Sequence, residues 1–237
     1  MLLSAEIRWF WRSAPPSTLL SWFKDERIHL CAVGGDPPER EDLYLIDGSQ
    51  SELGIKVRGQ KNIHPGDNAA VPMFKDVEAK GLLMVDSGVL RSGLLAGPVQ
   101  FWCKWPFRHI DLGSTKTLAV RKTRWLRRFD TTGSSAIEIS LDANEDPIDE
   151  SRRSGLPALG CNVELTEVQL PIGDDWWTFG LEAFGPLHTL GTSLLTVAEE
   201  LVQRGDGPEL HSGILLNYPQ WINQYGLSSQ GPGRTPE

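Results

Sequence analysis

The chain has 237 residues, enough for one large domain or two small ones, and 40% of them are hydrophobic, which is typical of a globular protein with a buried core. Its formal net charge of -8 does not favour nonspecific binding to DNA or to an anionic membrane. Cys31, Cys103 and Cys161 form no CxxC pair, and no run of 18 apolar residues indicates a membrane span, so we expect reduced thiols, no membrane partner and a cytoplasmic location.

The hydrophobic pattern predicts about nine strands and two helices. A strand is expected at 2–11, and a helix within 13–28, where apolar side chains recur at helical spacing. The other strands are expected at 42–46, 53–59, 74–83, 99–107, 118–129, 135–142, 161–170 and 176–184. A second helix is expected at 192–205, with Thr192 as its N-cap. Strands at these spacings are typical of an antiparallel sheet or barrel.

The predicted strands carry charges on one face and mostly apolar side chains on the other. In the first strand, Glu6 and Arg8 alternate with Ile7 and Trp9. The later strands place these charged residues in the same phase: Lys56, Arg58, Glu78, Lys80, Lys104, Lys122, Arg124, Glu138, Asp142, Glu164 and Glu182.

Two arrangements explain such faces. An antiparallel sheet with one solvated face would pair mixed charges across its strands. A closed barrel with the charged faces inward would need a ligand, because burying unpaired charges costs several kcal/mol each. Basic groups would then neutralise phosphate oxygens, and carboxylates would hold Mg²⁺ or Mn²⁺.

The order of the charged motifs resembles that of the CYTH-like triphosphate tunnel superfamily. Ser4-x-Glu6-x-Arg8 lies where that family has E-x-E-x-K, and 40–45 is similar to the stretch before its second strand. The segments IKVRG (55–59), VEAKG (77–81) and VRKTR (120–124) are similar to its basic strands. The segments AIEISLD (136–142) and NVELTEV (162–168) are similar to its acidic strands.

The resemblance runs over about 1–204 and implies an α+β fold, an antiparallel barrel of eight to nine strands with flanking helices. We expect a single domain over residues 1–225, and the composition of the end of the chain predicts a disordered tail, 226–237. It implies a triphosphate or polyphosphate ligand and a triphosphatase-type hydrolysis that depends on Mg²⁺ or Mn²⁺. The implied phosphate-binding residues are Arg8, Lys56, Arg58, Lys80, Lys122 and Arg124, and the implied metal ligands are Glu6, Glu138 and Glu164. Lys104 fits the alternation as a further phosphate-binding residue and Glu182 as a further metal ligand, and Glu78 and Asp142 are additional candidates for the metal.

The sequence also departs from the family signature. Ser4 replaces a metal-ligating Glu, and Arg8 replaces a Lys and is a poor general base because it keeps its proton. Three functions therefore stay open: a triphosphate hydrolase, a polyphosphate- or nucleotide-binding protein without hydrolysis, and a barrel whose charges only pair with one another.

Two further segments, one basic and one aromatic, are expected to have structural roles and not to bind a ligand. The basic segment 121–128 would send its charges to both faces of a strand, so nucleic acid is not an expected partner. The aromatic segment 217–222 is expected to pack across a barrel mouth.

Overall fold

The computed structural model describes residues 1–26, 37–46, 51–58, 75–90, 93, 95–110, 115–142, 144–149, 157–171, 173–204 and 210–226. Cys31 and the predicted disordered tail beyond Gly226 lie outside these ranges. The elements, in chain order, are β1 (Leu2–Arg12), α1 (Ser17–Lys24), β2 (Arg40–Leu45), β3 (Leu53–Val57), β4 (Lys75–Leu90), β5 (Gly97–Ile110), β6 (Thr117–Asp130), β7 (Ile137–Ile139), β8 (Gly160–Gln169), β9 (Asp175–Phe184), α2 (Leu187–Gln203), β10 (Ile214–Leu215), α3 (Tyr218–Trp221) and the π-helix η2 (Ile222–Gly226).

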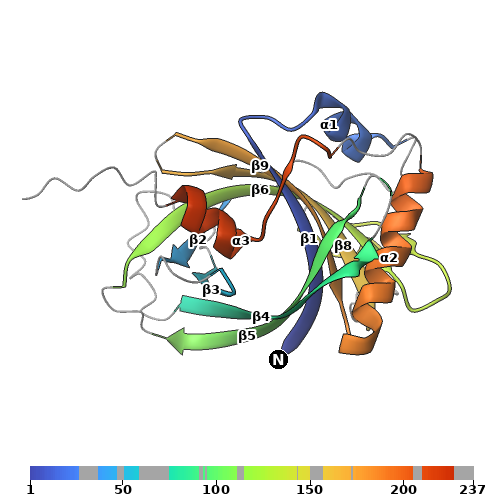
Figure 1. Ribbon diagram of the computed structural model, residues 1–237, viewed down its shortest axis with the longest axis horizontal. Helices are drawn as coiled ribbons and strands as arrows, with labels where there is room; N and C mark the ends of the chain where they lie inside the picture. The colour runs from blue at the N-terminus through green and yellow to red at the C-terminus, as the bar shows by residue number, and fades with distance from the viewer. Residues whose placement is uncertain are drawn as a thin grey trace, which may run out of the picture.

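Eight of the described strands form a closed antiparallel barrel (Figure 1). Their order around the barrel is β1-β5-β4-β3-β2-β6-β8-β9, and β9 pairs with β1 to close it. β10 pairs with the end of β1, and β7 pairs with the end of β6, so both lie outside the ring. The predicted α+β fold, an antiparallel barrel with helices beside it, is confirmed.

The outer face of the barrel forms the main hydrophobic core together with α1 and α2. The odd-numbered residues of β1, among them Ile7 and Trp9, are buried in this core. From α2, Leu190, Leu194 and Leu201 are fully buried, and Figure 1 shows this helix lying along the outside of the barrel. The even-numbered residues Glu6 and Arg8 must then point to the interior.

The helix α2 begins at Leu187 after Pro186, five residues before the predicted start, so the assignment of Thr192 as its N-cap is wrong. Gly191 lowers the intrinsic helix propensity of this first part. Packing of Leu190 and Leu194 on the barrel outweighs that cost, because burying one such side chain contributes about 1.5–3 kcal/mol. None of the helices in the described ranges is long and apolar enough to cross a membrane.

The segment formed by α3 and η2 packs against one end of the barrel interior. Trp221 stacks on Phe10 of β1, with 5.5 Å between the ring centroids. Asn217 caps α3 through a capping box with Gln220. Gly54 of β3 allows this close approach, because a Cβ atom there would lie 2.9 Å from Pro219. The interior is therefore apolar at this end and polar beyond it.

Candidate functional site

A polar cavity of about 290 Å³ lies inside the barrel, and all eight barrel strands contribute side chains to it. Among the described residues, its lining includes the nine basic residues Arg8, Arg40, Lys56, Arg58, Lys80, Lys104, Lys122, Arg124 and Arg128. It also includes the five acidic residues Glu6, Glu78, Glu145, Glu164 and Glu182. This lining has an excess of four formal positive charges, opposite in sign to the net charge of -8 of the whole chain.

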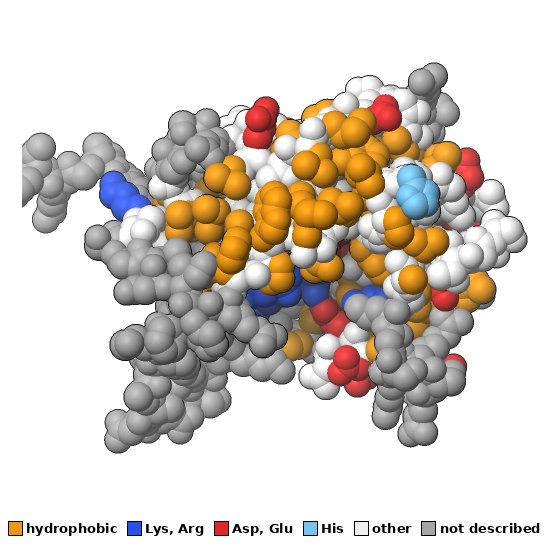
Figure 2. All heavy atoms as spheres, turned by 90° about the horizontal axis from the view of Figure 1, so that it is seen from below, with side chains coloured by type: hydrophobic (Ala, Val, Ile, Leu, Met, Phe, Trp, Pro, Cys, Tyr) orange, Lys and Arg blue, Asp and Glu red, His pale blue; other side chains and the backbone are white. Residues whose placement is uncertain are grey.

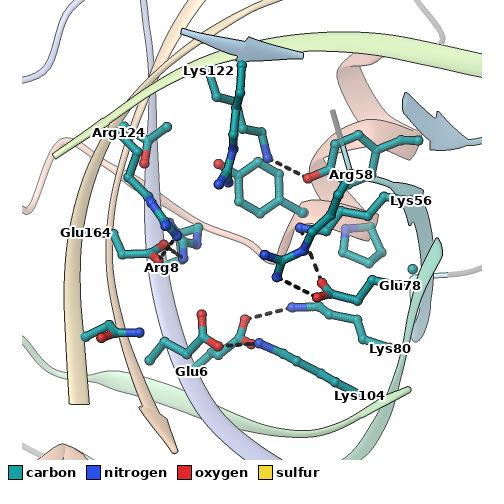
Figure 3. Close-up of a pocket in the computed structure, with 18 of the residues that line it drawn as sticks. Glu6, Arg8, Lys56, Arg58, Glu78, Lys80, Lys104, Lys122, Arg124 and Glu164 are labelled. Atoms are coloured by element: carbon teal, nitrogen blue, oxygen red, sulfur yellow. Dashed lines mark hydrogen bonds and ion pairs between the residues drawn. The ribbon is translucent and has the colours of Figure 1, made fainter. Parts of the chain in front are cut away.

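On one side of the cavity, Glu164 of β8 lies between two guanidinium groups (Figure 3). Arg8 donates to one carboxylate oxygen at 2.7 Å, and Arg124 donates to the other at 2.8 Å. Gly180 of β9 makes room for Arg8, because a Cβ atom there would lie 2.9 Å from the guanidinium carbon. Burial raises the pKa of Glu164, but Arg124 and Arg8 together outweigh that effect and hold the pKa well below 4.5.

A second group joins Glu6 of β1 to lysines from β4 and β5. Lys80 and Lys104 are directly opposite each other in the sheet, where like charges repel. Glu6 bridges them, with 2.7 Å from Oε2 to Lys80 Nζ and 2.8 Å from Oε1 to Lys104 Nζ. Lys104 also contacts Glu182 of β9. Burial raises the pKa of Glu6, but Lys104 and Lys80 outweigh it and lower the pKa well below 4.5.

The opposite side of the cavity carries a third group. Glu78 of β4 pairs with Lys56 at 3.3 Å and with Arg58 at 2.6 Å. Burial raises the pKa of Glu78, but these two cations outweigh it and lower the pKa from 4.5 to about 2. The side chain of Arg58 is 59% exposed, so it lies at the rim of the cavity, whereas Lys56 is 17% exposed.

Lys122 of β6 lies among aromatic rings and has little contact with solvent. Its Nζ donates to the hydroxyl of Tyr44 and lies 3.7 Å from the ring centroid of Tyr218 of α3. Its Nζ also lies 3.7 Å from Oδ2 of Asp42. Burial therefore outweighs the attraction of Asp42 and lowers the pKa of Lys122 well below 10.5.

The structure brings most of the predicted site residues into this one cavity. They are Glu6, Arg8, Lys56, Arg58, Glu78, Lys80, Lys104, Lys122, Arg124, Glu164 and Glu182. Among the described residues, the lining does not include Glu138 or Asp142. The Asp142 carboxylate instead accepts hydrogen bonds from the backbone N–H groups of Asn144 and Asp146 in its own loop.

The prediction that Glu138 lies beside the other candidate metal ligands is wrong, because its side chain does not line the cavity. β7 is not a member of the ring, so the period-two phase of the barrel strands does not apply to it. Glu138 is buried against Arg127 of β6, at 2.7 Å, and also pairs with Arg204 after α2. Arg127 in turn donates to the backbone carbonyl of Phe23, so this cluster ties α1, β7 and α2 to the barrel.

Replacing Glu138 with Ala is expected to lower the free energy of unfolding by about 3–5 kcal/mol, because removing one partner of a buried ion pair leaves the other charge uncompensated. The corresponding loss in melting temperature is on the order of 10 °C for a chain of this size. Thermal and urea unfolding would measure it. Glu199→Ala, on the exposed face of α2, is the control and should change little. Equal stabilities for both variants would contradict a structural role for Glu138.

Several cavity residues were not predicted from the sequence. Arg40 and Tyr44 come from β2, where the period-two spacing of strand residues puts both side chains on the same face. Glu145 comes from a loop and pairs with Arg124. Its backbone has φ 68°, which is uncommon outside glycine, and no local pattern indicates that this loop enters the barrel. Tyr218 reaches the cavity only because α3 packs inside the barrel end.

The cavity glutamates fit a divalent cation poorly. Glu6, Glu78 and Glu164 each pair with two Lys or Arg side chains. In the part of the chain that the structure describes, no group of three or more His, Cys, Asp or Glu side chains is arranged to hold a metal ion. Mg²⁺ demands near-octahedral oxygen geometry, and these separately paired carboxylates do not provide it.

Comparison with models of known protein families gives no match. Comparison with curated protein sequences gives no significant match either.

Proposed function

We propose that this protein binds a triphosphate or polyphosphate inside its barrel, as a divergent relative of the CYTH-like triphosphate tunnel proteins. The observation that carries this proposal is the convergence of basic side chains from the barrel strands on one cavity with an excess of four positive charges. A chain with a net charge of -8 has no general reason to concentrate positive charge in its interior. Such a cavity lowers its electrostatic free energy by taking in a polyanion.

The arrangement of the cations favours a chain of phosphates over other anions. Arg8 and Arg124 lie across the cavity from Lys56 and Arg58 (Figure 3). A phosphate chain presents oxygens in all directions along its length, so it can accept from both sides at once, whereas one carboxylate presents two oxygens in a single plane. The enclosed cavity has no room for a nucleic acid duplex, although the phosphate chain of a nucleotide fits the same chemistry.

Ligand entry requires exchange of partners. In the unliganded protein the cavity arginines and lysines donate to glutamates, as the Arg8–Glu164 and Lys80–Glu6 pairs illustrate. Phosphate oxygens would take over part of these donors, and the excess of basic over acidic groups leaves enough cations for both. The surface view shows blue and red side chains together at the base of a hollow (Figure 2). Because the ligand and the cavity attract each other through opposite charges, which salt screens, the affinity should fall strongly as the salt concentration rises.

We propose binding without metal-dependent hydrolysis, because the acids of the cavity are held by basic side chains. Isothermal titration calorimetry with tripolyphosphate, at two salt concentrations, tests the binding. Citrate and inorganic phosphate serve as comparison ligands of lower or differently arranged charge. We expect saturable binding of tripolyphosphate that is clearly tighter than that of either comparison ligand. No binding of tripolyphosphate would overturn the proposal.

Release of inorganic phosphate from tripolyphosphate, measured with and without Mn²⁺, separates a binding protein from a hydrolase. We expect no release above the uncatalysed rate in either condition. Mn²⁺-dependent release at catalytic turnover would instead favour the triphosphatase that the sequence resemblance implies.

A further inference from the structure

Lys104 lies between two glutamates of the cavity wall, Glu6 and Glu182. Glu6 of β1 and Glu182 of β9 are directly opposite in the antiparallel pair, on the same face. Two carboxylates placed in this way repel each other unless a cation lies between them. Lys104, from β5 on the other side of β1, places its ammonium there, 2.8 Å from Glu6 Oε1 and in contact with Glu182 Oε1.

Lys104 is held by two carboxylates, whereas its neighbour Lys80 pairs with one of them. The Lys104 ammonium contacts both Glu6 and Glu182. The Lys80 ammonium pairs with Glu6 and lies 4.3 Å from the ring centroid of Trp102. The Lys104 side chain is only 13% exposed, so its ammonium forms part of the cavity wall.

We propose that the Lys104 ammonium occupies the position that a divalent cation would take between Glu6 and Glu182, so that the ligand of this cavity is a metal-free polyphosphate. The ligand half of this inference rests on the proposed function, whereas the position of the cation does not. A lysine ammonium is a compact charge with three donors, which suits it to bridging two carboxylates from different strands.

The remaining lone pairs of Glu6 support the same inference. Its Oε1 accepts from the Ser4 hydroxyl at 3.0 Å as well as from Lys104. Its Oε2 accepts from Lys80 at 2.7 Å. Both oxygens therefore have donors already, and a metal ion would have to displace an ammonium that is tethered to the wall. A tethered cation has an effective concentration that free Mg²⁺ or Mn²⁺ must exceed.

Titration with Mn²⁺ in the absence of phosphate ligands, followed by electron paramagnetic resonance of free Mn²⁺, tests the position of the cation. We expect no saturable site in the wild-type protein over the titrated range. In Lys104→Met we expect a new site with a Kd at least about tenfold below the highest Mn²⁺ concentration at which the wild type shows no binding. Lys104→Arg, which keeps a charge, and Lys80→Met, which leaves Lys104 in place, are the controls and should gain no site.

The opposite results would overturn the inference. Saturable Mn²⁺ binding to the wild type that is lost in Glu182→Gln would show that a metal does compete for this position. This comparison does not depend on the folding of Lys104→Met. If that variant is folded by circular dichroism and binds no Mn²⁺, the two glutamates are not a latent metal site and the inference is wrong.

Calorimetry with tripolyphosphate tests the ligand half. We expect the wild-type protein to bind it in EDTA at least as tightly as in excess Mg²⁺, which shields the charge of the ligand. Binding that requires Mg²⁺ would overturn this inference while leaving the proposed polyphosphate site intact. Absence of binding in both conditions would overturn the proposed function, and the Mn²⁺ titrations would still decide the role of Lys104.

Discussion

Replacing Arg124 with Ala is expected to weaken tripolyphosphate binding by roughly 100-fold or more, because a bidentate arginine contributes two charge-assisted hydrogen bonds of about 1.5–3 kcal/mol each to a phosphate group. The guanidinium of Arg124 lies between Glu164 and Glu145 and is 20% exposed, so it is available to a ligand in the cavity. Its loss would also leave these two carboxylates with less compensation and make the cavity less attractive to any anion.

The matched control lies three residues away on the same strand. Arg121 is 60% exposed, pairs with Glu41 and does not line the cavity, so Arg121→Ala removes the same charge without touching the site. We expect this variant to bind tripolyphosphate within a factor of about two of the wild type, since long-range effects of exposed charges are screened by salt. Calorimetry on all three proteins measures the difference. Equal affinities of the two variants would contradict a ligand in the barrel interior.

The charged interior of the barrel could be predicted from the sequence because it depends on a local rule. Side chains in a strand alternate between two faces, so Glu6 and Arg8 on β1, or Lys122 and Arg124 on β6, must point the same way wherever the strand lies. Closure of the sheet then decides that this face is inside, and a single strand does not contain that information. The pairing of β9 with β1 settles it in the structure.

The positions of Glu138 and Glu145 could not be predicted from the sequence, because they depend on contacts between distant segments. Glu138 follows the same alternation as Glu164, yet β7 pairs only with the end of β6, and Arg127 and Arg204 bury its carboxylate outside the cavity. Glu145 enters the cavity from a loop whose course is fixed by backbone hydrogen bonds such as that from Glu145 N–H to Asp142. Periodicity carries no signal for either placement.

The ion pairs of the cavity explain how a barrel can hold so many interior charges. The pKa values of Glu78 and Glu164 lie below 4.5, so these carboxylates stay ionised and compensate the basic side chains. If the cavity binds a polyphosphate as we propose, they take the place of its oxygens while the cavity is empty. Buried pairs of this kind are weak sources of stability, because desolvation offsets much of the attraction. Stability alone therefore does not account for them, which is consistent with the binding function that we propose.

Lys122 should make both folding and binding depend on pH, in opposite directions. Because burial lowers its pKa well below 10.5, the native protein loses this proton while the unfolded chain still holds it. The free energy of unfolding rises with pH wherever the unfolded state binds more protons. We therefore expect the free energy of unfolding to increase with pH between the lowered pKa of Lys122 and about pH 10.4, the ordinary pKa of lysine. A bound phosphate would restore the proton, so affinity should fall as the pH rises through the same window.

The variant Lys122→Met isolates this effect, because it keeps the apolar stem against Tyr218 and removes the titrating group. We expect tripolyphosphate affinity near pH 7.5 to fall roughly 10- to 100-fold, the range that corresponds to about 1.5–3 kcal/mol for a lost charged hydrogen bond. Calorimetry in two buffers of different ionisation enthalpy, repeated at several pH values up to about pH 10, should show that the wild type takes up more protons on binding than Lys122→Met does within the window of the Lys122 titration. Both proteins meet the same ligand, so its own titration cancels in this difference. Lys116→Met, which removes an exposed lysine beside β6, should behave like the wild type. Identical proton uptake by wild type and Lys122→Met at every pH would mean that phosphate does not reach this lysine, and the ligand would then have to lie nearer to Lys80 and Lys104.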